Sequence, residues 1–388
     1  MDDQRGARPA PGVPTGARVA PAPQSHPMPA GQPSLSWDDG VIVAVDQRAL
    51  PGESRVLRLA SVDQLVAAIG SLAIRGAPAI GLAGALGVAL SARHHHTDGV
   101  LDTDAVRADV ARLAAARPTA VNLAWAVRRA AGHLAGGPDA VLAEALAMLA
   151  EDAALGAAAV ARACDLVLSR VAARPMSLLT HCNTGRLATA AVGTALGVVI
   201  ELGRRDLVRE VLVDETRPLL QGARLTAWEL GQADIAYRVC VDSAAPAAMA
   251  RGLVDCVLVG ADRIAANGDV ANKIGTYGLA IAAARHGIPF VVVAPESTWD
   301  RGLADGSGIV IEERDPAEVT TYAGLATTPP GAAAYNPAFD VTPAELITAI
   351  VSENRTFLPG AEPTARPPGA TRPASPGPTD RERPGVST

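Results

Sequence analysis

Residues 175–215 read PMSLLTHCNTGRLATAAVGTALGVVIELGRRDLVREVLVDE, and this stretch decides the fold. It begins with a short apolar run, continues with small helix-forming residues from Gly185 onward, and ends with a second apolar run, EVLVDE. A strand, a helix and another strand in this order are the repeating unit of a parallel sheet.

The same alternation continues toward the C-terminus. Further apolar runs occur at 235–242 (IAYRVCVD), 255–262 (DCVLVGAD) and 289–295 (PFVVVAP), with helices expected from Pro218 and from about Ile274. Continuous apolar strands are typical of parallel sheets that are covered on both faces. We therefore expect a Rossmann-like domain after Pro175.

The residues before Pro175 predict a different architecture. The runs VIVAV and RVLRL flank a Pro51–Gly52 turn and predict a small β element. Helix patterns then follow at Ser61–Ile74, Pro78–Ala92, Thr103–Ala116, Thr119–Leu134 and Asp139–Val171. The predicted fold class is α/β, with a mainly helical N-terminal domain at 35–174 and a Rossmann-like domain at 175–358. The Pro-rich ends, 1–34 and 359–388, predict disordered tails.

Composition excludes several function classes. The chain has 388 residues, a net charge of −6 and only 3% aromatic residues, so it offers no basic, stacking surface for nucleic acid. No apolar segment predicts a signal peptide or a membrane span, and we expect a cytoplasmic protein. The four cysteines are widely spaced, which favours reduced thiols over a disulfide framework or a zinc site.

Polar residues follow three of the predicted strands at one edge of the sheet. They are Cys182, the segment Asp214–Arg217, and Asp262. Ligands of open parallel sheets bind at this edge. No G-x-G-x-x-G motif follows any of the strands, so the sequence does not predict a nicotinamide cofactor.

Cys182 is either a buried structural thiol or a reactive one. A thiol at a helix N-terminus feels the macrodipole, which can lower its pKa from about 8.5 to roughly 3.5–7.5. The neighbouring His181 suggests a Cys–His hydrolase, but consecutive residues in extended chain point to opposite faces. We therefore expect that His181 is not the base for Cys182.

Asp262 ends an apolar strand, where partial burial would raise its pKa and suit it to proton transfer. Its alternative roles are a helix N-cap or an ion partner of Arg263. Asn272 and Lys273 follow in the same predicted loop and suit a phosphate oxygen, although a solvated lysine is equally compatible with the loop.

Two further clusters suggest anion binding. Arg75 and Gly76 precede Pro78 at a predicted helix start, and Arg117 precedes another predicted start at Thr119. An anion would compensate an arginine at the positive end of a helix. The triplet His94–His96 lacks the spacing and the carboxylates of a metal site, so we expect no metal.

Six motifs together identify a family. They are RGAPAIG (75–81), ARPTAVNLAW (116–125), THCNTG (180–185), DETRPLLQGARLTAWEL (214–230), GADRIAANGDVANKIGTYGLA (260–280) and NPAFDVTP (336–343). In this order, over about Asp46 to Pro343, the chain resembles the methylthioribose-1-phosphate isomerases. These enzymes are homologous to regulatory subunits of the exchange factor for translation initiation factor two.

The resemblance implies a homodimeric cytosolic enzyme of methionine salvage. It would convert a 5-substituted ribose 1-phosphate to the ribulose 1-phosphate, an aldose–ketose isomerisation, without a cofactor or metal. It assigns Cys182 and Asp262 as the catalytic residues. The substrate contacts that it implies are Arg75, Gly76, Ala77, Arg117, Gln221, Asn272 and Lys273.

A sugar phosphorylated at C1 has no free carbonyl, so its ring must open first. We assign protonation of the ring oxygen to Asp262 as general acid. Hydrogen then moves from C2 to C1, either after the Cys182 thiolate removes the C2 proton or as a hydride shift in a dry pocket. The sequence leaves both routes open.

Two segments depart from the family pattern. Asp242 is followed by Ser243-Ala-Ala-Pro246, where the family usually continues Asn-Met-Ala, and SENRTFLPG (352–360) replaces a TEKG segment. These changes leave another 5-substituted ribose 1-phosphate, such as 5-deoxyribose 1-phosphate, as an alternative to the leading substrate, 5-methylthioribose 1-phosphate. A non-catalytic regulatory subunit is a second alternative, but such a module needs no acid and thiol facing one pocket.

Overall fold

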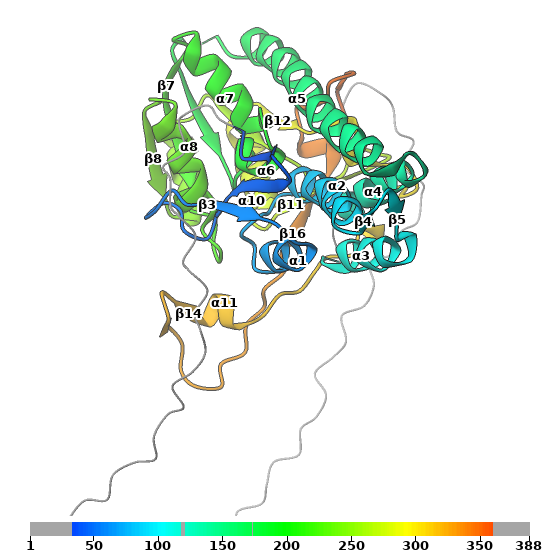
Figure 1. The fold of residues 1–388 in the computed structure, drawn as a ribbon. Helices are drawn as coiled ribbons and strands as arrows, with labels where there is room; N and C mark the ends of the chain where they lie inside the picture. Colours follow the sequence, from blue (N-terminus) through cyan, green and yellow to red (C-terminus); the bar gives the residue numbers. More distant parts are fainter. Residues whose placement is uncertain (1–32, 118–120, 173, 360–388) are drawn as a thin grey trace, which may run out of the picture.

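The computed structural model describes residues 33–117, 121–172 and 174–359. Both predicted tails lie outside these residues, apart from residues 33, 34 and 359, and so does the predicted helix start at Thr119. Figure 1 shows a helical part and a part built on a sheet, with one long helix running along both.

The N-terminal part consists of a small sheet and a layer of helices. The antiparallel strands are β1 (Leu35–Asp38), β2 (Val41–Val45) and β3 (Val56–Leu59). The helices are α1 (Val62–Gly70), α2 (Ala77–His94), α3 (Thr103–Ala115), α4 (Val121–Ala131) and α5 (Gly137–Arg170), with the hairpin β4 (His96–Thr97) and β5 (Val100–Leu101) after α2. The predicted helices therefore exist, with ends that differ by a few residues.

Small residues bring these helices close together. Helix α2 has buried residues on every side, and α1, α3, α4 and α5 all contact it. A Cβ at Gly84 would lie only 2.5 Å from a methyl group of Leu123 on α4. The glycine and alanine content of α2 therefore sets the spacing of the layer, since interiors are close-packed.

The second part is built on a seven-stranded sheet with the order β18-β17-β12-β9-β6-β7-β8. The strands are β6 (Met176–Thr180), β7 (Val208–Asp214), β8 (Tyr237–Cys240), β9 (Cys256–Val259), β12 (Phe290–Val293), β17 (Ala349–Val351) and β18 (Thr356–Phe357). All neighbours are parallel except β17 and β18. The predicted Rossmann-like class is confirmed.

Successive strand residues pack into two different cores. On β6, Leu178 joins a cluster with α7 (Ala195–Arg204) and the second half of α5, whereas Leu179 joins a cluster with α9 (Ala245–Ala250) and α10 (Thr276–His286). Val211 and Leu212 on β7 divide in the same way. Both faces of the sheet are therefore covered, which explains the uninterrupted apolar strands.

Helix α5 belongs to two cores. Its first half, including Val141 and Met148, packs into the core of the N-terminal part. Its second half, including Ala159 and Val167, packs into the core on one face of the large sheet. The predicted domain boundary at 174/175 stays a prediction.

Two predicted helices are shorter or less regular than expected. The helix expected from Gly185 is only α6 (Arg186–Thr189), and the chain breaks before α7 begins. The helix expected from Pro218 begins as a π-helical turn, η2 (Gly222–Thr226), and continues as α8 (Ala227–Gln232). Both segments follow the carboxyl end of a strand, β6 or β7, and π-helical turns such as η2 often accompany function.

A smaller sheet covers one side of the same edge. Its strands are β10 (Arg263–Ala265), β11 (Val270–Lys273), β13 (Trp299–Asp300) and β16 (Phe339–Thr342). The segment predicted as a loop after Asp262 is therefore a hairpin, and it places Asn272 and Lys273 on a strand.

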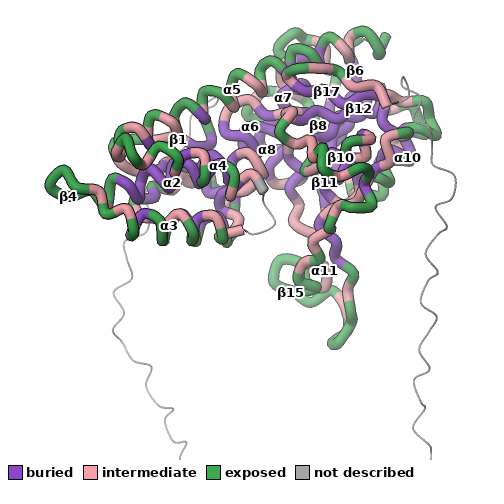
Figure 2. Tube along the Cα trace, turned by 90° about the vertical axis from the view of Figure 1, so that its right-hand side faces the viewer, coloured by how far each residue is buried: buried purple, intermediate pink, exposed green. Residues whose placement is uncertain are grey.

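An arm projects from the body of the molecule (Figure 1). It contains α11 (Ala317–Thr320), β14 (Thr321–Tyr322) and β15 (Leu325–Ala326). Figure 2 shows that the arm is mostly exposed, whereas the centre of the body is buried. Among the helices of the described ranges, none has the length and apolar character needed to cross a membrane.

Candidate active site

Three neighbouring strands end at one edge of the large sheet. β6 lies between β7 and β9, and all three strands are parallel. Their carboxyl ends lead into Cys182, Asp214–Arg217 and Asp262, as the sequence predicts. The charged side chains that act electrostatically on the Cys182 thiol are Arg75, Lys273 and Asp262. We call the group Arg75, Arg117, Cys182, Asp262 and Lys273 the strand-end site.

The backbone of Cys182 is held in an uncommon conformation. Its φ is 61°, in the left-handed region that few residues other than glycine adopt. Two threonines fix it there: Cys182 N donates to Thr216 Oγ1 at 2.9 Å, and Thr226 Oγ1 donates to Cys182 O at 2.6 Å. Such strain persists only where surrounding contacts hold it, which is typical of functional positions.

The expectation of a thiol with a pKa lowered by a helix is wrong. The helix that follows, α6, has only four residues, and Cys182 lies before its cap, Gly185. Burial raises the pKa of Cys182, against the opposing effect of the cations Arg75 and Lys273. The resting side chain is therefore a neutral thiol at neutral pH.

His181 does not contact the thiol as a base. Its Nδ1 lies 2.9 Å from Asp214 Oδ2 and its Nε2 lies 2.8 Å from the Ile274 carbonyl oxygen. Burial opposes a charge on the ring, but the hydrogen bond and charge of Asp214 outweigh burial and raise the pKa of His181. Both ring nitrogens are engaged, so the Cys–His hydrolase alternative is excluded by geometry.

Asp262 has neither of the two alternative roles. It precedes strand β10 and not a helix, and Arg263 pairs with Asp300 at 3.5 Å. Its residue surface is exposed, yet burial of the carboxyl raises its pKa, with Lys273, Arg117 and Arg75 acting in the opposite direction. Both observations hold for a carboxyl with water on one side and protein on the others. The raised pKa agrees with the prediction.

Lys273 is not a solvated lysine. It is buried, its Nζ donates to the Ala338 carbonyl at 2.8 Å, and it lies 5.0 Å from the centre of the Phe339 ring. The neighbouring Asn272 donates from Nδ2 to Thr276 Oγ1 at 2.9 Å. An ammonium that is buried beside a carboxyl and a thiol is placed to bind an anion.

Gly76 lets two loops approach each other. Its φ is 94°, and a Cβ would lie 2.5 Å from the Ala188 carbonyl oxygen. Gly76 is also the residue before α2, so the free N–H groups at Ala77 and beyond begin beside the loop that carries Cys182. This arrangement places a helix N-terminus next to the strand-end site, as anion binding requires.

Two of the predicted substrate contacts have buried atoms without a partner. Within the described part of the chain, Arg75 Nε and Gln221 Oε1 are buried and accept or donate no hydrogen bond. Buried polar atoms are normally satisfied, so these two are candidates for contacts with a ligand. Gln221 stands directly before the π-helical turn that contains Thr226.

Sequence reasoning missed two polar residues beside the site, Asn183 and Glu229. Asn183 Oδ1 accepts a hydrogen bond from Arg75 Nη2 at 2.7 Å, and Asn183 Nδ2 donates to Glu229 Oε1 at 2.8 Å. A carboxylate within the apolar run LTAWEL was the available signal, because a buried charge needs partners.

A group of possible metal ligands also lies at this edge. Donor atoms of His181, Asp214 and Asp242 lie within 4.8 Å of one another. Asp242 already accepts from the N–H groups of Thr216 and Arg217, each at 2.7 Å, and both His181 nitrogens are engaged. These contacts indicate that the group stabilises the turn after β7 and does not form a metal site.

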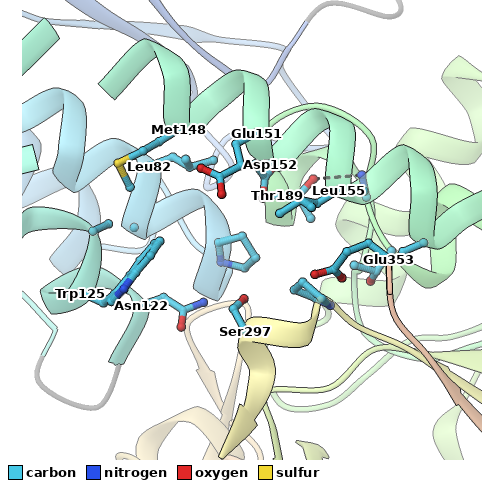
Figure 3. Close-up of a pocket in the computed structure, with 18 of the residues that line it drawn as sticks. Leu82, Asn122, Trp125, Met148, Glu151, Asp152, Leu155, Thr189, Ser297 and Glu353 are labelled. Carbon is cyan, nitrogen blue, oxygen red and sulfur yellow. Dashed lines mark hydrogen bonds between the residues drawn. The ribbon is translucent and has the colours of Figure 1, made fainter. Parts of the chain in front are cut away.

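A separate cavity of about 280 Å³ lies between α2, α4 and α5. Figure 3 shows Leu82, Trp125 and Met148 on one side of it and Glu151 and Asp152 at its upper wall, with Ser297 and Glu353 opposite. Burial, together with the charge of Glu151, raises the pKa of Asp152 to about 7. None of the predicted site residues lines this cavity.

Comparison with known proteins agrees with the motifs. A profile of the Initiation factor 2 subunit family matches residues 73–357. The chain is 63% identical over 335 residues to a probable bifunctional methylthioribose-1-phosphate isomerase/methylthioribulose-1-phosphate dehydratase of Nocardia farcinica, covering 86% of this chain and 61% of that relative. This chain therefore spans less than two thirds of that relative's length.

Two further proteins are similar over nearly their whole length. A 5-deoxyribose 1-phosphate isomerase of Moorella thermoacetica is 48% identical over 337 residues, which cover 84% of this chain and 94% of that protein. The crystal structure of 5-methylthioribose 1-phosphate isomerase from Pyrococcus horikoshii OT3 matches with a TM-score of 0.78 and 37% identity, over 84% of this chain and 93% of that one. The resemblance predicted from the six motifs is confirmed.

Proposed function

The chain belongs to the Initiation factor 2 subunit family, and we propose that it converts 5-methylthioribose 1-phosphate to 5-methylthioribulose 1-phosphate. This reaction is an aldose–ketose isomerisation and a step of methionine salvage. We extend only the isomerase part of the Nocardia name to this chain. The Moorella and Pyrococcus proteins, which the chain covers to 94% and 93%, are named as isomerases alone.

The observation that carries the proposal is the composition of the strand-end site. A carboxyl with a raised pKa, a thiol and three cations act on one another at the strand ends. A pure binding module for an anion needs the cations but neither the acid nor the thiol. Together with the isomerase names of the relatives, this favours catalysis over a regulatory role.

The proposed reaction begins with the phosphate bound by Arg75, Arg117 and Lys273. The N–H groups that follow Gly76 and the side chains of Gln221 and Asn272 complete the substrate contacts. Asp262, which its raised pKa keeps protonated to a higher pH, donates a proton to the ring oxygen as the C1–O bond of the ring breaks. Fixed cations and amides supply positioning, which accounts for a large part of many enzymatic barriers.

Hydrogen then moves from C2 to C1, and the C2 hydroxyl passes its proton to the Asp262 carboxylate, which ring opening left deprotonated, as C2 becomes the ketone. The raised pKa of Cys182 supports a hydride shift, because removal of the C2 proton by this side chain would need the less populated thiolate. A bound phosphate would offset the cations Arg75 and Lys273 and raise the pKa further. In this route the neutral thiol lies beside C1 and C2 and excludes water from them.

The test is turnover followed by carbon NMR. Wild type should form the ketose from 5-methylthioribose 1-phosphate faster than from 5-deoxyribose 1-phosphate, whereas Cys182→Ser and Asp262→Asn should each lose most activity. Asp165→Asn, on the exposed side of α5, is the matched control and should keep full activity. In deuterated water, substantial incorporation at C1 would exclude a pure hydride shift.

Two outcomes would contradict the proposal. A clear preference for 5-deoxyribose 1-phosphate would support the alternative substrate that the Moorella relative's name suggests. If wild type turns over neither sugar but binds a nucleotide or a protein tightly, the chain is a regulatory subunit.

We also propose a homodimer. Strand β8 stands at the edge of the large sheet, and its side chains Tyr237 and Val239 are exposed, as is Val241 directly after the strand. The arm adds the exposed residues Tyr322 and Leu325. Apolar side chains on an open edge favour association with a second copy. Sedimentation equilibrium should give twice the chain mass, and Val239→Glu should weaken the dimer.

A cytoplasmic location is part of the same proposal. All four cysteines are free thiols, and three of them are buried. Free thiols persist in reducing compartments. A sugar phosphate substrate is consistent with this location.

A further inference from the structure

Asn183 and Glu229 form a buried pair beneath the strand-end site. Asn183 is 4% exposed and Glu229 is 2% exposed, and 46 residues separate them in the chain. Besides the amide of Asn183, Glu229 accepts from the N–H of Arg186 at 2.9 Å and from the N–H of Leu187 at 3.5 Å. One carboxyl group therefore holds Asn183, Arg186 and Leu187, all in the segment that follows Cys182.

The contacts of Asn183 fix the orientation of its side-chain amide. Its Nδ2 donates both to Glu229 Oε1 at 2.8 Å and to Thr226 Oγ1 at 3.2 Å. Both carboxyl oxygens of Glu229 already accept backbone N–H groups, so the amide nitrogen must be the atom that faces them. The amide oxygen consequently faces the other way, toward Arg75.

Arg75 receives its orientation from this oxygen. Its Nη2 donates to Asn183 Oδ1 at 2.7 Å, across 108 residues of sequence. Its Nε is buried without a protein partner among the described residues, which leaves it for a ligand. The guanidinium also stabilises the negative form of the Cys182 side chain. The hydrogen bond from Nη2 to Asn183 thus fixes the plane of the guanidinium, and with it the direction in which Nε points.

The sequence leaves room for the pair. A Cβ at Gly185 would lie 2.4 Å from both carboxylate oxygens of Glu229. Thr226 links the pair to Cys182, since its hydroxyl accepts from Asn183 and donates to the Cys182 carbonyl. The network is therefore closed, with each polar group oriented by the next.

From these contacts we propose that Asn183 and Glu229 are positioning residues that hold the Arg75 guanidinium beside the Cys182 thiol. The inference deepens the proposed function and rests on it only for its effect on turnover. Glu229 orients Asn183, Asn183 orients Arg75, and Arg75 acts on the thiol and on the substrate anion. Neither Asn183 nor Glu229 needs to touch the substrate.

The first test measures the thiol itself, without substrate. The rate of Cys182 alkylation by iodoacetamide is followed against pH, with peptide mass spectrometry to identify the site. Burial raises the pKa of Cys164 to about 11 and that of Cys240 and Cys256 to about 12, and the peptide masses separate their alkylation from that of Cys182. We expect Asn183→Leu to raise the apparent pKa of Cys182 by about one unit.

A double-mutant cycle with Arg75→Met shows whether Asn183 acts through the arginine. If it does, adding Asn183→Leu to Arg75→Met should change the thiol pKa by less than about 0.3 units, because coupled residues are not additive. Glu229→Gln, which keeps the shape of the side chain, should shift the pKa in the same direction. Glu201→Gln, a carboxylate on α7 paired with Arg205, is the matched control and should leave the thiol pKa unchanged.

Turnover provides the second measurement. We expect Asn183→Leu to lower kcat/KM about 100-fold, with a higher KM, since the phosphate contact of Arg75 is lost. The inference would be overturned if Asn183→Leu shifts the thiol pKa equally in the presence and in the absence of Arg75. It would also be overturned if Asn183→Leu and Glu229→Gln both fold and both leave the thiol pKa unchanged. If the coupling is present but wild type turns over no sugar phosphate, the proposed function fails and the positioning role stands.

Discussion

Two carboxyls, Asp262 in the strand-end site and Asp152 in the cavity between the helices, share a raised pKa for the same reason, which is the loss of water around the carboxyl group. Their neighbours differ. Three cations, Lys273, Arg117 and Arg75, act on Asp262, whereas among the described residues the charge that acts on Asp152 is the like charge of Glu151. A perturbed pKa therefore does not identify an active site by itself, because only the first carboxyl has partners for an anionic substrate.

The largest expected effect separates the two carboxyls by activity. Asp262→Asn should lower kcat about 1,000-fold, because it removes a proton donor. The free energy of unfolding should change by less than about 0.5 kcal/mol, since the Asp262 side chain has no hydrogen bond or ion pair with the described residues that the substitution would break. Steady-state kinetics and urea unfolding measure both quantities.

The pH dependence follows from the direction of the shift. A general acid must be protonated, and the raised pKa of Asp262 extends the protonated form to higher pH. Activity should therefore fall as pH rises through this pKa, and Asp152→Asn should leave that profile in place. A profile that moves with Asp152 and not with Asp262 would reverse the comparison.

The second prediction concerns how the strand-end site is held. Gly76→Ala should destabilise the protein by about 3 kcal/mol, because its Cβ would overlap the Ala188 backbone and its φ of 94° disfavours alanine. Gly99→Ala is the matched control: Gly99 has a φ of 80° but no atom within 4 Å of the added Cβ. It should cost only about 1 kcal/mol of backbone strain.

Urea unfolding of the two glycine variants measures the difference. Equal losses would mean that backbone strain accounts for both, and that the close approach of the two loops contributes nothing. A larger loss in Gly76→Ala, together with weaker substrate binding, would show that the approach shapes the site.

The smallest expected effect concerns the cavity. Asp152 has a pKa of about 7 in the folded protein and an ordinary value of 3.8, so the folded state binds this proton more tightly. Its contribution to stability is fully present below about pH 4 and is lost as pH rises through about 7. Asp152→Asn keeps a neutral side chain and should stabilise the protein by about 1–2 kcal/mol at pH 8 and by less at pH 5.

Activity should be unchanged in Asp152→Asn, because the cavity contains none of the proposed site residues. Asp165→Asn on the same helix should stay within about 0.5 kcal/mol of wild type at both pH values. A loss of turnover in Asp152→Asn would show that the cavity takes part in the reaction.

The architecture and the two central residues could be predicted from the sequence. The local periodicity of apolar residues predicts strands and helices, and their alternation from Pro175 onward predicts a parallel sheet. In such a sheet the carboxyl ends of neighbouring strands share an edge, so Cys182 and Asp262 could be placed together before any coordinates were known.

Local signals were less informative where tertiary contacts reshape the chain. The helix expected from Gly185 stops after four residues, and the loop expected after Asp262 is the β10–β11 hairpin. In both segments the backbone follows contacts with distant strands and loops. Propensity is a weak guide in such places.

The sequence by itself thus determined the α/β class, the edge of the sheet at which we expect ligands to bind, and the residue types gathered there. Only the tertiary structure decided the direction of the Cys182 pKa, because that depends on how burial compares with two nearby cations. It alone also joined Arg75 to Asn183, across 108 residues, and Asn183 to Glu229. Periodicity reports which face of an element is buried, whereas contacts between distant side chains depend on how the whole chain folds.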